Sequence, residues 1–401
     1  MSKLYYPKII IKSGKEDAVL RQHPWIFSGA IAKIEGKPED GDIVTVHRKN
    51  NEFLAIGHYH DGSIAVRIFG FEEVEPNAAF WQDKIGRAWK LRQLLNLTNN
   101  ENTNCFRIAH GEGDGLPGLI MDYYDGVVVF QAHSIGMHRC QAEIVEALKH
   151  CIGDQLKAVY DKSRSTLPPI YGATMRDSLV YQKDELAENR AFVLENGYKF
   201  DVNWETGQKT GFFLDQRKNR ALLREFVVGK SVLNAFCYSG GFSIYALKAG
   251  AASVDSVDVS SKAIDLLERN IEINDLQDAA HQSYMQDVLK FLQASEKQYE
   301  VMVLDPPAYA KSMNKRHQAV QGYKRLNIEG LKKIAPGGIL FTFSCSQVVD
   351  KTLFYNTITA AAIEAGRNVR VLQHISQPED HPVSIFHPEG SYLKGLVLYV
   401  E

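Results

Sequence analysis

The stretch SVLNAFCYSGGFS, residues 231–243, decides the fold of this 401-residue chain. Apolar and β-branched residues predict a strand, the small residues that follow predict a tight turn, and a helix follows the turn. Such a turn lets the backbone approach a ligand closely, with amides at a helix amino terminus facing its polar groups. A tight turn in an ordinary α/β sheet is the alternative, so the neighbouring segments must distinguish the two.

The next predicted strand, residues 253–258, ends in Asp258, which lies 24 positions after Asn234. A carboxylate at the end of the second strand of a doubly wound sheet is placed to bind ribose hydroxyls. This pattern fits a dinucleotide and also fits S-adenosylmethionine (SAM). Because the glycine spacing is not G-x-G-x-x-G, it favours SAM.

Two later segments extend the pattern. Residues 263–274 read as a crossover helix, and residues 284–288 as a third strand carrying Asp287, which suits an adenine amino group. The strand at 299–304 leads into Asp305-Pro-Pro-Ala-Tyr, a rigid acidic lip with an aromatic residue at the carboxyl edge of the sheet. Two prolines alone would only break a strand, but their place two strands after the turn favours a ligand site.

Composition excludes several classes of protein. The hydrophobic fraction of 45% and the charged fraction of 23% are ordinary for soluble globular proteins and exclude collagen-like, disordered and low-complexity chains. No apolar run reaches the ~18 residues of a membrane span, and the amino terminus lacks a signal-peptide core, so we expect a cytoplasmic protein without a membrane partner. The net charge of −2 does not indicate a nucleic-acid partner, which must rest on local patches.

The chain divides into three segments with different sequence patterns. Residues 1–72 contain short strands separated by turn signals, which predict a small β-barrel. Residues 73–188 mix helical and strand patterns and predict a central α+β domain, with the polar run at 182–190 as the linker. Residues 189–401 alternate short apolar strands with helices, which predicts the parallel sheet of an α/β fold.

Residues 231–346 resemble the class I SAM-dependent methyltransferases. The whole chain is similar to the bacterial 23S ribosomal RNA large-subunit methyltransferase I family, which forms 5-methylcytosine. The matching motifs are residues 206–217, 234–241, 305–309, 343–346 and 387–396. The resemblance implies a Rossmann-like carboxy-terminal sheet, an amino-terminal PUA-like RNA-binding barrel and a central α+β domain.

The resemblance and the turn together give a set of cofactor-binding residues. Within residues 210–220, the family places Gln216 and Arg217 near the methionine carboxylate and phosphate groups, although a plain amphipathic helix is the alternative. The expected cofactor-binding residues are Gln216, Arg217, Asn234, Phe236, Ser239, Gly240, Gly241, Asp258, Ser260, Asp287 and Asp305.

Cys345 is the candidate nucleophile. Carbon 5 of cytosine attacks a methyl sulfonium only after a thiolate has added to carbon 6, and Cys345 follows the predicted strand 338–343 at the sheet edge of Asp305. Asp305 would protonate the ring nitrogen, and water or Asp305 itself would take the carbon-5 proton. The other cysteines, Cys105, Cys140, Cys151 and Cys237, form no C-x-x-C pair and are expected to pack, with no metal site. A core role for Cys345 is the alternative.

A basic cluster follows the acidic lip. Residues 306–333 hold seven cations and one acid, a local charge of +6, where phosphates flanking a target base would lie. The expected RNA-binding residues are Pro306, Pro307, Tyr309, Lys311, Lys315, Arg316, Lys324 and Arg325, and Tyr309 and Tyr323 could stack on an extruded base. Residues 1–15 add Lys3, Lys8, Lys12 and Lys15 without an acid. A solvated face is the alternative for both runs.

Three other functions stay open at this point. Methylation of a base nitrogen needs the Asp-Pro-Pro lip but no thiol, a nucleotide-linked oxidoreductase would use the same sheet, and an RNA-binding module could have lost its activity. The sequence likewise leaves three questions open: which nucleotide is the target, whether the substrate is free ribosomal RNA or an assembly intermediate, and whether the protein is a monomer or a homodimer.

Overall fold

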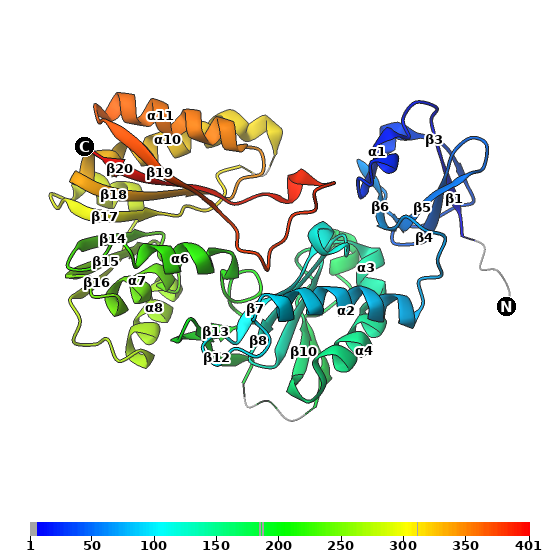
Figure 1. Ribbon diagram of the computed structural model, residues 1–401, viewed down its shortest axis with the longest axis horizontal. Coiled ribbons are helices and arrows are strands. Elements are labelled where there is room, and N and C mark those ends of the chain that lie inside the picture. Colours follow the sequence, from blue (N-terminus) through cyan, green and yellow to red (C-terminus); the bar gives the residue numbers. More distant parts are fainter. Residues whose placement is uncertain (1–5, 184–185, 187, 311) are drawn as a thin grey trace. The chain divides into compact units, whose positions relative to one another are not determined.

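The computed structural model describes residues 6–183, 186, 188–310 and 312–401. The chain forms two compact units, each built from several segments (Figure 1). Unit 1 comprises Met1–Ala191, Val202–Phe212 and Glu379–Gly390, and unit 2 comprises Phe192–Asp201, Phe213–Pro378 and Ser391–Glu401. The boundaries expected for three domains, 1–72, 73–188 and 189–401, stay a prediction.

The amino-terminal part of unit 1 is a six-stranded sheet in the order β2-β6-β5-β4-β1-β3. Its elements are β1 (Lys8–Ile11), α1 (Asp17–Leu20), β2 (Trp25–Phe27), β3 (Ile31–Glu35), β4 (Ile43–His47), β5 (Phe53–Tyr59) and β6 (Ile64–Gly70). Alternate residues such as Ile9, Ile11, Val44 and Val46 are fully buried in its core. This period of two is what a half-buried strand requires.

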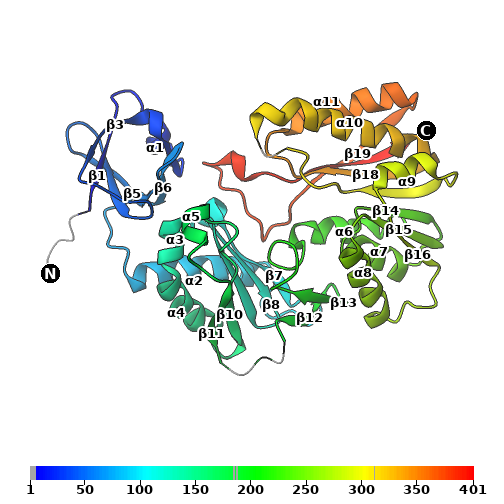
Figure 2. The same ribbon diagram turned by 180° about the vertical axis from the view of Figure 1, so that it is seen from behind.

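The central part of unit 1 is a five-stranded sheet in the order β11-β10-β9-β8-β7. Its elements are α2 (Ala78–Leu94), β7 (Cys105–His110), β8 (Leu119–Tyr124), β9 (Val127–Ala132), α3 (Ile135–Arg139), α4 (Gln141–Ile152), β10 (Ala158–Asp161), α5 (Pro169–Gly172) and β11 (Ser178–Gln182). Helices α2 and α4 run along this sheet (Figure 2) and share its core through Trp81, Ile85 and Leu148. The Asn77 side chain begins α2 by accepting the Phe80 N–H at 3.1 Å.

A buried ionic network holds the late segment 379–390 in unit 1. The Arg92 guanidinium donates to both carboxylate oxygens of Asp114, at 2.5 and 2.8 Å, and to the Asp380 carbonyl at 2.7 Å. The Arg107 N–H donates to the Asp380 carboxylate at 3.0 Å. Because charge-assisted bonds away from water are strong, this segment is firmly anchored although it is distant in sequence.

Unit 2 is built on a seven-stranded sheet in the order β16-β15-β14-β17-β18-β20-β19. Its strands are β14 (Ser231–Ala235), β15 (Ser253–Asp258), β16 (His281–Met285), β17 (Tyr299–Leu304), β18 (Ile334–Ser344), β19 (Val369–Ser376) and β20 (Lys394–Val400). A two-stranded sheet of β12 (Arg190–Glu195) and β13 (Tyr198–Asn203) precedes it. The first five strands of the order are parallel, and β20 is antiparallel to both β18 and β19.

Helices cover both faces of this sheet (Figure 1). They are α6 (Arg217–Leu223), α7 (Gly241–Lys248), α8 (Ser261–Ile273), α9 (Val288–Ala294), α10 (Arg316–Lys333) and α11 (Lys351–Ala365). The predicted α/β fold is therefore confirmed. The strand order reverses at β14, between β15 and β17, and ligands of such sheets bind at the carboxyl ends of the strands at this point.

One predicted strand is displaced. The segment expected at 284–288 is strand β16, which ends at Met285. Asp287 instead caps α9, because its carboxylate accepts the Lys290 N–H at 2.9 Å. Across the described ranges, no helix combines the length and the apolar character needed to cross a membrane.

Candidate active site

The turn after β14 has an unusual backbone. Phe236, Tyr238 and Gly240 have φ angles of 61°, 44° and 75°, in the left-handed region. A non-glycine residue there costs on the order of 1–3 kcal/mol, so other contacts must hold it. The Tyr238 N–H donates to Asp258 Oδ2 at 3.0 Å. At Gly240 an added Cβ would lie 2.0 Å from Leu267 Cδ1, so only glycine fits.

The predicted cofactor residues around this turn divide into two groups. Asn234 and Ser239 are buried and serve the scaffold: Asn234 Nδ2 donates to Ser243 Oγ at 2.8 Å, and the Ser239 carbonyl accepts from Asn270 Nδ2 at 2.8 Å. Asp258 is only half-buried, and its Oδ1 accepts the Ser260 N–H at 2.9 Å. Asp258 therefore lies at the open edge with lone pairs left for a ligand.

Two apolar residues that sequence reasoning missed lie close in sequence to Asp258 and Asp287. Val259 directly follows Asp258 and is 72% exposed, and Met285 ends β16 two residues before Asp287 and is 64% exposed. Exposed apolar side chains next to carboxylates at one strand edge suit a ligand with a flat ring and a ribose. The detectable signal was an apolar residue placed at the end of a parallel strand.

Asp305 follows β17 and has a strongly perturbed carboxyl group. Gln216 Nε2 donates to Asp305 Oδ2 at 2.8 Å. Burial, assisted by the charge of Asp215, raises the pKa of Asp305 to about 7, although the Gln216 hydrogen bond and Arg220 act in the opposite direction. The carboxyl group is thus divided between its protonated and ionised forms near neutral pH.

Residues around Gln216 hold it in place. Asn219 Nδ2 donates to Gln216 Oε1 at 2.6 Å, and the Tyr392 hydroxyl donates to Asp215 Oδ2 at 2.6 Å. Arg217 is buried. The region is a 3₁₀ turn, Leu214–Gln216, followed by the short helix α6, rather than one amphipathic helix.

Arg220 serves the fold of unit 2. Its guanidinium donates to both carboxylate oxygens of Glu195, at 2.8 and 2.7 Å, and to the Phe213 carbonyl at 3.0 Å. Both side chains of the pair are almost completely buried. Arg220 therefore fixes the path of the chain just before Gln216.

Cys345 directly follows β18, is half-buried and forms no disulfide. Burial raises the pKa of the neighbouring Tyr323 hydroxyl to about 12, and the charges of Cys345 and Asp305 contribute to the rise. Cys345 and Asp305 therefore both lie within electrostatic range of one hydroxyl. Cys237, in contrast, is buried in the turn, and burial raises the pKa of its thiol, which agrees with a packing role.

Lys394 is a buried cation beside Cys345 that sequence reasoning did not select. It begins β20 opposite Ser344, and its Nζ donates to the Ser346 carbonyl at 2.6 Å. Burial lowers the pKa of Lys394 to about 8, and the charge of Cys345 opposes this shift. The only signal in the sequence was its place in the motif 387–396.

The lip after Asp305 presents a mixed surface. Pro306 is buried and Pro307 exposed, and the half-buried Tyr309 ring covers Gly322, where an added Cβ would lie 2.9 Å from it. Tyr323 is fully buried with its ring centroid 4.7 Å from that of Tyr309. The prediction that Tyr323 stacks on a base is therefore wrong for this structure, because Tyr309 and Phe354 cover it.

The basic cluster is smaller than its count of residues predicted. Arg316 pairs with Asp350 at 3.3 Å, and Lys324 pairs with Glu364 at 2.6 Å, both acids lying outside the counted window. Lys315 and Arg325 are exposed, whereas Lys311 lies outside the described residues. The local charge available to a phosphate is therefore below +6.

The amino-terminal lysines are also partly engaged. Lys8 Nζ donates to Asn51 Oδ1 and Lys12 Nζ donates to the Gly29 carbonyl, each at 2.9 Å. Lys3 lies outside the described residues. These contacts favour a solvated face of the barrel for Lys8 and Lys12.

Comparison with protein families gives two matches. Residues 9–71 match a PUA-like domain, and residues 107–385 match the S-adenosylmethionine-dependent methyltransferase family. Among solved structures, a SAM-dependent methyltransferase from Streptococcus mutans superposes with a TM-score of 0.83 at 22% identity, over 98% of this chain and 99% of that chain. A methyltransferase complexed with S-adenosylhomocysteine (SAH) superposes with a TM-score of 0.84, also at 22% identity and over the same shares of the two chains.

Curated relatives match over almost the full length. Ribosomal RNA large subunit methyltransferase I of Pseudoalteromonas atlantica is 38% identical, over 98% of this chain and 99% of its own. The protein of the same name from Shewanella amazonensis is 39% identical over the same shares of the two chains. The resemblance found in the sequence is thereby confirmed, as is SAM as the cofactor. The chain belongs to the ribosomal RNA large subunit methyltransferase I family of SAM-dependent methyltransferases.

Proposed function

We propose that this protein transfers a methyl group from SAM to carbon 5 of a cytosine in the ribosomal RNA of the large subunit, through a covalent adduct with Cys345. The observation that carries the proposal is the half-buried Cys345 thiol directly after β18. This strand pairs with β17, which leads into Asp305, and the Lys394 cation lies beside the thiol. The names of the curated relatives support ribosomal RNA as the substrate.

The open edge of the sheet fits the cofactor. SAM supplies an electrophilic methyl group when bound. Asp258 and Asp287 would accept hydrogen bonds from the ribose and the adenine, and Val259 and Met285 would cover the ring. The turn residues would face the cofactor with backbone amides, and Gln216 and Arg217 would contact its methionine end. The turn residues concerned are Asn234, Phe236, Ser239, Gly240 and Gly241, with Ser260 after β15.

The chemistry follows from three side chains. The Cys345 thiolate forms a bond to carbon 6 of cytosine, and the displaced electron pair is neutralised at the ring nitrogen by a proton from Asp305. Carbon 5 then takes the methyl group, the methyl–sulfur bond breaks, and SAH leaves. Carbon 5 and the ring nitrogen then each lose a proton, of which one restores Asp305 and the other passes to water. Cleavage of the carbon–sulfur bond restores the Cys345 thiolate and completes the cycle.

The perturbed groups suit these roles. A pKa of about 7 keeps a share of Asp305 protonated at neutral pH, as proton donation requires. Lys394, with a pKa of about 8, is still largely charged there and would favour the thiolate of Cys345.

RNA would reach this site along the lip and the basic residues after it. We assign RNA contacts to Pro306, Pro307, Tyr309, Lys311, Lys315, Arg316, Lys324 and Arg325, with phosphates on the cations and the target base beside Tyr309. We assign RNA binding also to the PUA-like barrel at residues 1–72, which is followed by the central α+β domain at 73–188 and the methyltransferase domain at 189–401. A soluble, cytoplasmic location and either a monomer or a homodimer are compatible with this role.

The test is methylation of ribosomal RNA that lacks the modification, using labelled SAM. We expect Cys345→Ala to abolish transfer, and wild-type protein to be trapped covalently on RNA containing 5-fluorocytosine. Cys151→Ala, which removes another half-buried thiol, is the matched control and should keep full activity. Full activity of Cys345→Ala, or a product methylated on a base nitrogen, would contradict the covalent mechanism and favour nitrogen methylation.

A further inference from the structure

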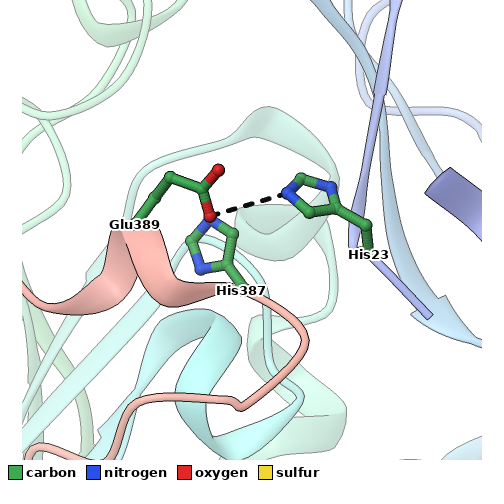
Figure 3. A group of neighbouring side chains, drawn as sticks. All are labelled: His23, His387 and Glu389. Carbon is green, nitrogen blue, oxygen red and sulfur yellow. Dashed lines mark ion pairs between the residues drawn. The ribbon is translucent and has the colours of Figure 1, made fainter. Parts of the chain in front are cut away.

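Two histidines and one glutamate form a cluster in unit 1 that has no part in the methyl-transfer chemistry. His23 precedes β2, and His387 and Glu389 flank Pro388 in the segment 379–390. One ligand atom from each side chain lies within 4.8 Å of the other two. Figure 3 shows the His387 imidazole next to the Glu389 carboxylate, with the His23 imidazole facing both.

His387 is the unusual member of the cluster. It is 3% exposed, and within the part of the chain that the structure describes neither of its ring nitrogens has a hydrogen-bond partner. Leaving a polar group buried without a partner costs about 1–3 kcal/mol. A neutral imidazole carries one ring-nitrogen lone pair that can bind a ligand. A ligand at this nitrogen would remove the cost.

The distances within the cluster suit a shared cation better than hydrogen bonds. Glu389 Oε2 lies 3.7 Å from His23 Nε2 and 3.8 Å from His387 Nε2. Hydrogen bonds between nitrogen and oxygen are shorter, about 2.7–3.2 Å. Ligands bound at about 2.0–2.1 Å to one tetrahedral ion lie about 3.4 Å apart. Each of the two glutamate–histidine pairs needs to close by only a few tenths of an ångström, and the two imidazole nitrogens lie within 4.8 Å of each other.

The surroundings also orient the imidazoles. His23 Nδ1 accepts the Trp25 backbone N–H at 3.2 Å and lies 3.3 Å from the Trp25 carbonyl. Acceptance at Nδ1 places the proton of the neutral ring on Nε2, so a metal at Nε2 would move that proton to Nδ1, where the Trp25 carbonyl can accept it, as is common for metal-bound histidines. The Trp25 ring packs against His387 with a centroid distance of 4.3 Å. Trp25 itself is fixed, because its indole N–H donates to Glu112 Oε1 at 2.7 Å.

We propose that His23, His387 and Glu389 bind one divalent first-row transition metal ion. Two imidazoles and one carboxylate suit Zn²⁺ and its neighbours rather than Mg²⁺ or Ca²⁺, which prefer oxygen ligands. The Glu389 side chain is 54% exposed, so the ion has an entry path and a coordination position open to water. The ion would join the segment 379–390 to the start of β2 and stabilise unit 1.

The test is titration of the full chain with Zn²⁺ after treatment with a chelator, by calorimetry and by competition with a chromophoric chelator. All proteins carry Cys345→Ala and Cys151→Ala, so that neither half-buried thiol binds the probe. We expect one Zn²⁺ per chain at micromolar affinity or better, a higher unfolding temperature with Zn²⁺ but not with Mg²⁺, and a Co²⁺ spectrum with ligand-field bands but no thiolate charge-transfer band.

Substitutions locate the site. His387→Ala should weaken Zn²⁺ binding by more than about tenfold, and Glu389→Gln, a surface change that the fold tolerates, should weaken it clearly. His60→Ala is the matched control, because His60 also faces a carboxylate in the barrel, Asp40 at 3.0 Å, but has no second imidazole in a three-ligand group. Binding only at millimolar Zn²⁺, or equal binding by His387→Ala, Glu389→Gln and His60→Ala, would overturn the proposal.

Discussion

Replacing Asp305 by Asn should stabilise the protein while it abolishes methyl transfer. The isosteric amide can still accept the Gln216 hydrogen bond through its oxygen, so local packing is kept. The substitution removes an ionisable carboxyl group. Burial and the charge of Asp215 make the ionised form of that group unfavourable in the folded protein. The variant therefore separates the function of this side chain from its cost to the fold.

The magnitude follows from the pKa of Asp305. It lies at about 7 in the folded chain, against an ordinary value of 3.8. The native state binds this proton more tightly than the unfolded chain, so stability falls as the pH rises from 3.8 to about 7, and the cost is complete above that window. At ~1.36 kcal/mol per pKa unit the upper limit is about 4 kcal/mol. We expect about half of it after the site relaxes.

Urea unfolding of the two proteins without SAM, at pH 8 and pH 5, measures this difference. At pH 8 we expect Asp305→Asn to be more stable by about 2 kcal/mol, and this advantage should be smaller at pH 5, where more of Asp305 is protonated. Asp278→Asn, a change at an exposed carboxylate of unit 2, is the control and should have no pH-dependent effect. An Asp305→Asn advantage that is absent at pH 8, or equal at both pH values, would refute the reasoning.

Three further changes test other parts of unit 2. Glu195→Gln leaves the buried Arg220 guanidinium without a charged partner and should destabilise the chain by about 3–5 kcal/mol in urea; a loss under ~1 kcal/mol would mean that water reaches the pair. Gly240→Ala should weaken SAH binding by more than about tenfold in calorimetry, because its Cβ would meet Leu267, whereas Gly250→Ala, also at positive φ but in open space, should not. Lys394→Met should lower kcat by more than about tenfold and shift its pH profile upward, with partial rescue by Lys394→Arg; an unchanged pH profile would exclude an effect on the thiol.

The parts of the fold that the sequence predicted are those that depend on local pattern. The strand and turn at 231–243 became β14 and the start of α7, and Asp258 ends β15 as expected. Each was readable because strand, turn and helix signals follow one another within a few residues. The short strands β2 and β3 carry little local signal, since three to five residues show hardly any periodicity.

The parts that the sequence could not predict depend on contacts between distant segments. Nothing in residues 394–400 says that β20 inserts antiparallel between β18 and β19, and only that insertion places Lys394 beside Cys345. The predicted charge of +6 for the basic cluster at residues 306–333 was too high for the same reason. The acid that neutralises Lys324 is Glu364, on another helix, so a window of consecutive residues could not include it.

The carboxy-terminal segment of unit 2 supplies partners to both reactive groups of the proposed mechanism. Tyr392 donates to Asp215, whose charge helps to raise the pKa of Asp305, and two residues later Lys394 lies beside Cys345. An acid that must hold its proton and a thiol that must lose one need opposite electrostatic surroundings within one site. The structure provides them by placing a carboxylate near the acid and a buried cation near the thiol. Because β20 pairs with β18, and Ser344 at the end of β18 lies opposite Lys394, the cation lies next to the point where the chain enters Cys345.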